Sequence, residues 1–205
     1  RNITVIDYGM GNVWSVTSAL KYLGAKPELV SDTEIISESS LLVLPGVGSF
    51  KKGMEALKNR GLDEAIINAV KIKGGRILGI CLGMQLMGSF GTEGGETPGL
   101  GLLPNQVERF TSQELGENKA PHVGFNPVRF NEREGLFKEL SLESDFYFAH
   151  SYRMLPEETV GRFATCFYGI DLLAAFEINN ICGTQFHPEK SQTNGLILLR
   201  NFLIT

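Results

Sequence analysis

The first half of this 205-residue chain alternates short apolar runs with amphipathic segments of helical period. Leu41–Leu44 is one such run, and it is stopped by Pro45 and Gly46, as expected of a strand buried on both faces. Arg76–Cys81 is another, and the amphipathic stretch Asp63–Lys73 precedes it. Strands that alternate with helices predict a parallel sheet covered by helices on both faces. The other elements expected here are a strand over Ile3–Asp7 and a helix over Asn12–Leu23.

The second half consists mostly of strand-like segments separated by Gly, Pro and Asn. We therefore expect an open α/β fold of flavodoxin-like kind in a single domain, residues 1–205. Its central sheet should be mostly parallel and flanked by helices, with antiparallel additions from this half. The strands expected are Gln106–Phe110, Asn126–Phe130, Phe146–Ala149, Phe163–Tyr168, Leu173–Ile178 and Cys182–Phe186, followed by a closing helix over roughly Gly195–Phe202.

Composition argues against several classes of protein. A net charge of −4 disfavours a general nucleic-acid binder, which needs a basic face. No apolar run approaches the roughly 18 to 20 residues that cross a bilayer, and the first residues lack a secretory pattern, so we expect no membrane association. Three cysteines without a CxxC pair disfavour a disulfide framework or a metal site. A location in the reducing cytoplasm fits best.

The stretch Gly79-Ile80-Cys81-Leu82-Gly83 has the form G-x-C-x-G between a predicted strand and a predicted helix. With serine at its centre, this pattern is the nucleophile elbow of α/β-hydrolases. Such a turn forces strained dihedrals on the central residue and leaves no room for side chains at either glycine. It places the nucleophile at a helix N-terminus, which favours a thiolate, and frees the N–H of Leu82 for an oxyanion. The alternative is that Cys81 is a buried apolar residue, as free cysteines usually are.

A thiol nucleophile needs a base, and the base needs an orienting group. His187 ends an apolar run, and Glu189 follows two residues later on the same face of an extended chain, which Pro188 would stiffen. A carboxylate there could set the tautomer of the imidazole. The alternative is a surface His and Glu in a turn. His122 and His150 lie in aromatic stretches that favour structural roles, and the remaining cysteines, Cys166 and Cys182, are interpreted as core.

A second glycine turn, Gly46-Val47-Gly48, follows the strand at Leu41–Leu44. No Gly-Lys-Ser/Thr comes after it, so it is not a Walker loop, and the early "GMGN" turn lacks the third glycine of a dinucleotide fingerprint. No cofactor is therefore expected. Successive parallel strands would bring the Gly46–Gly48 turn beside Cys81, where it could donate a backbone N–H to an oxyanion.

The segments "PGVGSF", "GICLGMQL" and "FHPEK" together closely resemble the class I (triad-type) glutamine amidotransferases over nearly the whole chain. More narrowly, "IDYGMGN", "PHVGFN" and "YFAHSY" are similar to the glutaminase subunits of imidazole glycerol phosphate synthase in histidine biosynthesis. The resemblance implies an L-glutamine hydrolase with a catalytic triad that forms a cysteinyl thioester. The residues it implies are Cys81, His187 and Glu189 for catalysis, Gly46, Val47, Gly48 and Leu82 for the oxyanion, and Gln85, Glu96, Ser151 and Tyr152 for glutamine.

The resemblance also implies a separate (β/α)8 cyclase subunit that forms a heterodimer with this chain and takes up the ammonia through a channel. "PHVGFN" and "YFAHSY", with Tyr147 and Lys190, would lie at or near that interface. Phe125 stands where the family usually has Trp, so an indole N–H is lost. The family's oxyanion turn is expected to need a peptide rotation induced by the partner. The alternatives are a glutaminase serving an anthranilate, GMP or pyridoxal phosphate synthase, or a non-catalytic regulatory α/β module.

Overall fold

The computed structural model describes residues 1–156 and 161–204. The strands are β1 (Asn2–Ile6), β2 (Lys26–Val30), β3 (Leu41–Leu44), β4 (Arg76–Ile80), β5 (Phe90–Gly91), β6 (Thr97–Pro98), β7 (Gln106–Arg109), β8 (His122–Phe130), β9 (Glu143–His150), β10 (Tyr152–Met154), β11 (Arg162–Tyr168), β12 (Ile170–Ile178) and β13 (Ile181–Thr184). The helices are α1 (Val13–Tyr22), α2 (Thr33–Glu38), α3 (Phe50–Lys58), α4 (Leu62–Ile67), α5 (Leu82–Leu86), α6 (Ser112–Leu115) and α7 (Gln192–Ile204).

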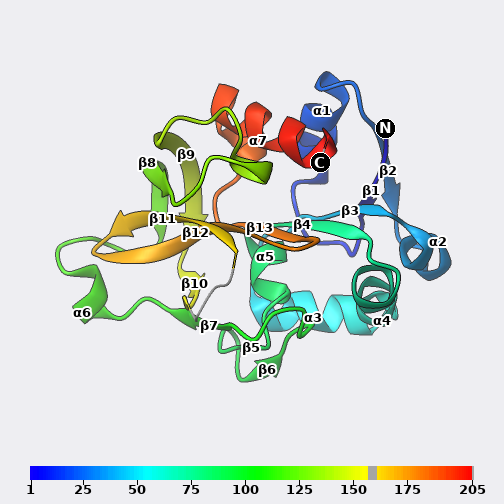
Figure 1. Cartoon of the computed structure of the whole chain (residues 1–205). Coiled ribbons are helices and arrows are strands. Elements are labelled where there is room, and N and C mark those ends of the chain that lie inside the picture. Colours follow the sequence, from blue (N-terminus) through cyan, green and yellow to red (C-terminus); the bar gives the residue numbers. More distant parts are fainter. Residues whose placement is uncertain (157–160, 205) are drawn as a thin grey trace.

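One large sheet crosses the molecule with the strand order β2-β1-β3-β4-β13-β12-β11-β8-β9 (Figure 1). From β2 to β13 the neighbouring strands are parallel, and from β13 to β9 each pair is antiparallel. The predicted α/β class, with antiparallel additions from the second half, is confirmed. A smaller second sheet, β10-β7-β5-β6, was not predicted, and Gln106–Arg109 belongs to it rather than to the central sheet.

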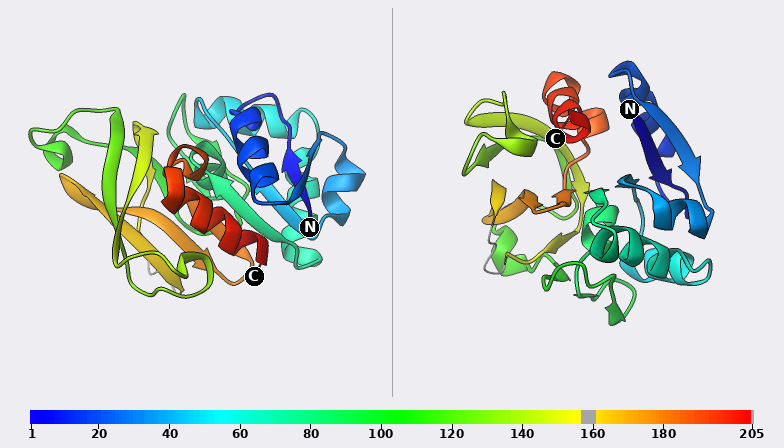
Figure 2. Two further views of the ribbon diagram at one scale, coloured as in Figure 1. Left: turned by 90° about the horizontal axis from the view of Figure 1, so that it is seen from above. Right: turned by 45° about the vertical axis from the view of Figure 1, so that its right-hand side comes forward.

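Helices cover both faces of the parallel half of the sheet. In Figures 1 and 2, α1 and α7 lie side by side on one face, while α3, α4 and α5 lie on the other. Strand β3 shows why its sequence is continuously apolar: Leu41 and Val43 join the core under α1 and α7, whereas Leu42 and Leu44 join the opposite core. Both of its faces are buried.

Element boundaries differ from the sequence expectations where apolar periodicity carries little information. Strand β2 was not predicted because most of its residues are not buried and it contains Pro27, as an edge strand can. The expected single helix over Asp63–Lys73 is an α-helix, Leu62–Ile67, that continues as a π-helical turn, Asn68–Ile72. Within the described ranges, no helix has the length and apolar character needed to span a membrane.

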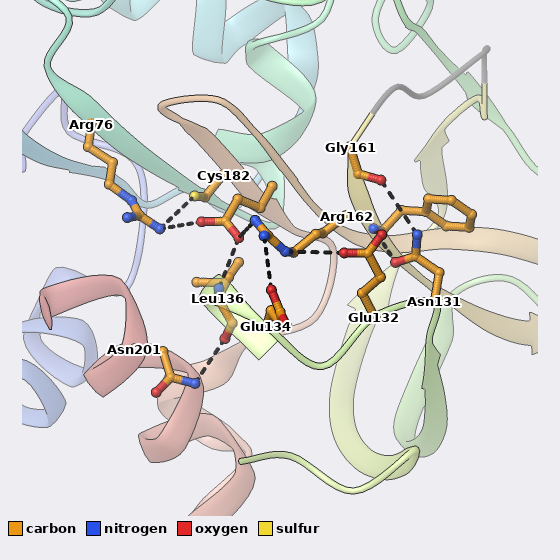
Figure 3. A network of polar contacts seen from close by, with 11 residues as sticks. Arg76, Asn131, Glu132, Glu134, Leu136, Gly161, Arg162, Cys182 and Asn201 are labelled. Carbon is orange, nitrogen blue, oxygen red and sulfur yellow. Dashed lines mark hydrogen bonds and ion pairs between the residues drawn. The ribbon is translucent and has the colours of Figure 1, made fainter. Parts of the chain in front are cut away.

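A buried carboxylate ties the antiparallel strands to the parallel ones (Figure 3). Glu177 of β12 accepts hydrogen bonds from Arg76 Nη2 at 2.6 Å and from the backbone N–H of Leu136 at 3.0 Å. Arg162 Nη1 of β11 completes its partners at 3.2 Å. A buried charge is tolerated when it is paired and hydrogen-bonded, and these contacts join strands β4, β11 and β12. They lie at the start of β4, whereas Cys81 follows the end of that strand.

Candidate active site

Cys81 occupies a strained turn between β4 and α5. Its backbone dihedrals are φ 53° and ψ −110°, a conformation that L-residues rarely adopt. Its N–H donates to the carbonyl of Thr184 at 2.7 Å, which anchors the turn to β13. The residue is 5% exposed. The predicted elbow is therefore present, and the strain points to a positioned side chain rather than to ordinary core packing.

The two glycines of the elbow are there because the backbones approach too closely for side chains. A Cβ at Gly83 would lie 1.8 Å from the carbonyl oxygen of Leu44, and one at Gly79 would lie 2.7 Å from the backbone nitrogen of Met84. The first contact is with β3 and the second with α5 itself. A side chain at either position would push α5 away from the sheet and displace Cys81.

Sheet register brings the distant base to the nucleophile. Strand β13 pairs in parallel with β4, with Thr184 opposite Ile80, so both strands end at the same edge. Three residues later, the N–H of His187 donates to the carbonyl of Tyr147 at 2.8 Å. The imidazole is buried, and its side chain interacts with that of Cys81. Residues separated by more than a hundred positions thus meet beyond the carboxyl ends of neighbouring strands.

Glu189 orients the imidazole: its Oε1 lies 2.8 Å from His187 Nδ1, and its side chain is only 1% exposed. Burial by itself lowers the pKa of His187, but the Cys81 and Glu189 side chains outweigh burial and raise it well above its usual range. The backbone between the two residues is not extended as expected. Pro188–Lys190 forms a 3-10 turn, which proline at its first position favours.

A pocket of about 300 Å³ opens beside Cys81. The Gly46–Gly48 turn lies next to the elbow, because a Cβ at Gly46 would be 2.9 Å from the N–H nitrogen of Gly83. Most of the residues expected around glutamine line this pocket, namely Val47, Gly48, Leu82, Gln85, Ser151 and Tyr152. The parallel strands β3 and β4 place the Gly46–Gly48 turn beside the elbow, as predicted, whereas Ser151 and Tyr152 come from the end of β9 and the start of β10.

Glu96 is exposed and does not belong to the pocket wall, and neither does Gly46, although it adjoins the elbow. Glu93 lies on that wall instead, and its Oε2 accepts the N–H of Phe50 at 3.1 Å. Burial raises the pKa of this carboxyl. Glu93 rather than Glu96 thus lies on the pocket wall, and the two residues between them, Gly94 and Gly95, both have positive φ.

Sequence reasoning missed one residue beside the nucleophile. The side chain of Gln185 is buried, and its Nε2 donates to Cys81 Sγ at 3.7 Å. Its Oε1 accepts from Gln85 Nε2 at 3.0 Å, and the same Nε2 of Gln85 donates to the carbonyl of Tyr152 at 2.9 Å. The available signal was its position directly after strand β13, two residues before His187.

His122 and His150 are buried and hydrogen-bonded to each other, as expected of structural histidines. Burial lowers the pKa of His122 to about 4 and that of His150 to about 3, from an ordinary 6.5. Both rings are therefore neutral near pH 7. The other two cysteines are also buried, and burial raises the pKa of each thiol, Cys166 and Cys182, to about 12.

These neutral histidines predict that the free energy of unfolding falls as the pH is lowered from 7 to 5. In that window the unfolded chain binds protons on both rings while the folded chain does not, so acid favours unfolding. The loss is about 2 kcal/mol for His150 alone, and His122 adds to it. Urea unfolding at several pH values measures it, and equal stability at pH 5 and pH 7 would contradict the prediction.

His187→Gln is the matched control for that measurement. Because the pKa of His187 is raised, its stabilising contribution is complete below 6.5 and is lost as the pH rises above that value. The variant should therefore still lose stability between pH 7 and pH 5, by at least as much as the wild type.

Comparison with known proteins shows the family of this chain. A family model described as glutamine amidotransferase class-I matches residues 4–205. The fold resembles the crystal structure of a glutamine amidotransferase, with a TM-score of 0.75 at 20% identity, covering 98% of this chain and 96% of the other. It also resembles PurLQS from Thermotoga maritima, with a TM-score of 0.73 at 19% identity and coverage of 98% and 97%. The chain belongs to the class-I glutamine amidotransferase family, and it is an enzyme of that class.

Within that family, its similarity is to imidazole glycerol phosphate synthase subunits named HisH. It is 45% identical to HisH 1 of Parasynechococcus marenigrum, covering 98% of this chain and 96% of that protein. It is 43% identical to HisH of Moorella thermoacetica, covering 98% and 94%. Because each of these relatives is named as one subunit of a synthase, a partner subunit is implied.

Proposed function

We propose that this chain is the glutaminase subunit of an imidazole glycerol phosphate synthase, which hydrolyses L-glutamine and delivers ammonia to a separate cyclase subunit. The observation that carries the proposal is the buried His187–Glu189 pair, 2.8 Å between Nδ1 and Oε1, set against a strained Cys81 at the same sheet edge. The full-length similarity to HisH subunits supports the choice of synthase. A non-catalytic module would have no reason to keep that strain.

The reaction follows from this arrangement. Sγ of Cys81 attacks the side-chain amide carbon of glutamine, and His187 transfers the thiol proton to the amide nitrogen, so that the C–N bond breaks and ammonia leaves. Water, deprotonated by His187, then attacks the thioester carbon, and the C–S bond breaks to release glutamate and regenerate the thiol. Glu189 holds the imidazole and stabilises its charged form.

The oxyanion that forms in each step needs backbone donors. The N–H of Leu82 follows the nucleophile directly, and a second N–H comes from the Gly46-Val47-Gly48 turn on the pocket wall. Glycines on both sides of Val47 allow the peptide to rotate at little cost, because glycine adopts positive φ freely, as Gly48 does at 111°. The partner subunit would induce that rotation.

The amino-acid end of glutamine is held by the remaining pocket residues. We assign the ammonium to Glu93, and the rest of that end to Gln85 and to the backbone of Ser151 and Tyr152. One oxygen of Glu93 accepts the N–H of Phe50, which fixes the carboxylate in place.

Glu93→Gln should therefore raise the KM for glutamine by roughly tenfold to a hundredfold, the effect of losing a hydrogen bond to a charged group, with a smaller change in kcat. Steady-state kinetics of glutamate release in the complex measure both constants. Glu96→Gln is the matched control and should leave KM near the wild-type value, because Glu96 is exposed and outside the pocket. A raised KM in Glu96→Gln together with a wild-type KM in Glu93→Gln would instead assign the ammonium to Glu96.

The partner is a (β/α)8 cyclase that binds over the antiparallel end of the sheet, near the site. Phe125 is 48% exposed and packs edge-on against Tyr147, with ring centroids 5.5 Å apart. Lys190 Nζ lies 5.8 Å from the Tyr147 ring centroid. This aromatic and basic surface stands beside the loop that carries His187, so ammonia would leave toward it. The nucleophilic thiol must stay reduced, which fits the cytoplasm.

Purified chain mixed with candidate synthase subunits tests this function. We expect the imidazole glycerol phosphate cyclase subunit to raise glutamate release by roughly 5- to 150-fold, the range of typical coupling energies. The comparison subunits are those of anthranilate, GMP and pyridoxal phosphate synthases. If only one of these stimulates the chain, the assignment to histidine biosynthesis fails while the glutaminase activity stands.

A further inference from the structure

Two buried histidines lie side by side on the neighbouring strands β8 and β9, next to the pocket. His122 of β8 is the cross-strand partner of His150 of β9, and both side chains are buried. His122 Nδ1 lies 3.0 Å from His150 Nε2. At the pocket end, His150 Nδ1 lies 2.8 Å from the carbonyl oxygen of Tyr152, and at the other end His122 Nε2 lies 3.0 Å from Nδ2 of Asn126. Every nitrogen of these two rings has a partner.

The Tyr152 carbonyl determines which atom donates and which accepts in each of these hydrogen bonds. A carbonyl only accepts, so His150 must carry its proton on Nδ1. The ring is neutral, and its Nε2 is therefore an acceptor that requires a proton on His122 Nδ1. His122 Nε2 is then an acceptor in turn, and it receives an N–H from Asn126. One backbone oxygen thus determines two tautomers and the orientation of an amide.

On the other side of that carbonyl, further hydrogen bonds lead to the nucleophile Cys81. Tyr152 O also accepts from Gln85 Nε2 at 2.9 Å, and Gln85 holds Gln185, whose Nε2 donates to Cys81 Sγ. Gln85 and Tyr152 both line the glutamine pocket. The position of this carbonyl therefore affects the substrate site directly.

Aromatic packing holds the His122 ring in place. The His122 ring stacks between Phe148 and Tyr168, with centroid distances of 4.4 and 3.9 Å. Asn126 follows Phe125, whose exposed ring lies on the opposite face of β8 within the surface assigned to the partner. A shift of β8 at Phe125 would thus move Asn126 and change the contact to His122.

We propose that Asn126, His122 and His150 form a one-directional hydrogen-bond relay that positions the Tyr152 carbonyl and Gln85 and couples the glutamine pocket to the outer surface of β8. His122 and Asn126 are positioning residues in this relay and touch no substrate. The coupling rests on the proposed function, since it needs a partner at that surface. The tautomers follow from the geometry alone.

The tautomers are tested first, by long-range proton–nitrogen NMR of the ¹⁵N-labelled chain near pH 7, with the three histidines assigned through single-site variants. We expect His122 and His150 each to carry one proton, on Nδ1. A proton on Nε2 of either ring, or a charged ring, would overturn the relay, whatever the function of the chain.

Positioning is tested by two replacements of His122. His122→Leu removes both contacts and should raise the KM for glutamine roughly tenfold, the equivalent of one hydrogen bond, with little change in kcat. His122→Asn keeps a donor near the place of Nδ1 and should restore KM to near the wild-type value. Equal KM values in the two variants would show that His122 only fills space.

Coupling is tested at the far end with Asn126→Ala. Stimulation by the cyclase subunit, expressed relative to the activity of the same variant alone, should fall severalfold at saturating partner. Asn131→Ala is the control, because Asn131 follows β8 and bonds to Phe163 N and Gly161 O, outside the relay. Full stimulation in Asn126→Ala, or an equal loss in Asn131→Ala, would refute the coupling. If no synthase subunit stimulates the wild-type chain, the proposed function is refuted instead. The tautomer measurement does not depend on that outcome.

Discussion

In the Cys81→Ala variant, the rate of glutamine-dependent turnover is expected to fall by roughly 10⁴-fold or more, because removal of the catalytic nucleophile lowers the rate by that much in hydrolases with a triad. The elbow that holds Cys81 depends on Gly79 and Gly83 and on backbone bonds, and alanine leaves these in place. The complex with the cyclase subunit should therefore still use ammonia that is added at high pH. Glutamate release and ammonia-dependent synthesis, measured on the same preparation, give the two rates.

Cys166→Ala is the matched control for this experiment. Cys166 is equally buried, in strand β11, but it lies in ordinary strand backbone away from the pocket wall. Its loss should leave glutaminase activity close to that of the wild type. Retention of glutamine hydrolysis in Cys81→Ala, with the fold intact by thermal unfolding, would remove the triad assignment.

His187→Ala should lower kcat by roughly 10²- to 10⁴-fold, the contribution of a positioned general acid and base. Without the imidazole, the thiol proton has no acceptor and the leaving nitrogen has no donor. Glu189→Gln should lower kcat less than His187→Ala does but more than a surface substitution does, because it removes the group that orients the ring and stabilises its positive charge. Glutamate release at saturating concentrations of the cyclase subunit measures the wild type and both variants.

The same two variants show whether His187 and Glu189 act in catalysis or in binding of glutamine. Neither replacement should change KM by as much as Glu93→Gln, since neither side chain meets the amino-acid end of glutamine in the proposed site. If His187→Ala keeps wild-type kcat, another base must serve Cys81. The neutral, fully hydrogen-bonded His150 could not take that role without breaking its bond to Tyr152 O.

The parallel half of the fold followed from local pattern. Leu41–Leu44 was predicted with the bounds that the structure shows, because four apolar residues before Pro-Gly have few alternatives when both faces are buried. Strand β2 and the second sheet were missed. Their strands lie at an edge or are only two to four residues long, so burial imposes little pattern on them.

The chemistry of the site was determined by the sequence itself. A cysteine between glycines at a strand end has the pattern of a nucleophile elbow, and a histidine with a carboxylate two residues away can supply a base with an orienting group. Both patterns lie within a few neighbouring residues, whereas the contact with Leu44 that excludes a side chain at Gly83 is a tertiary one. The two patterns predicted Cys81, His187 and Glu189, which the structure brings to one edge of the sheet.

Only the tertiary structure decided which side chains surround them. The parallel register that sets Thr184 against Ile80 brings Gln185 to Cys81, and the course of one glycine-rich loop puts Glu93 rather than Glu96 on the pocket wall. The pairing of His122 with His150 likewise depends on how β8 and β9 align. Contacts between distant segments are set by strand register and loop path, which depend on the energy of the whole sheet and not on the pattern of any one segment.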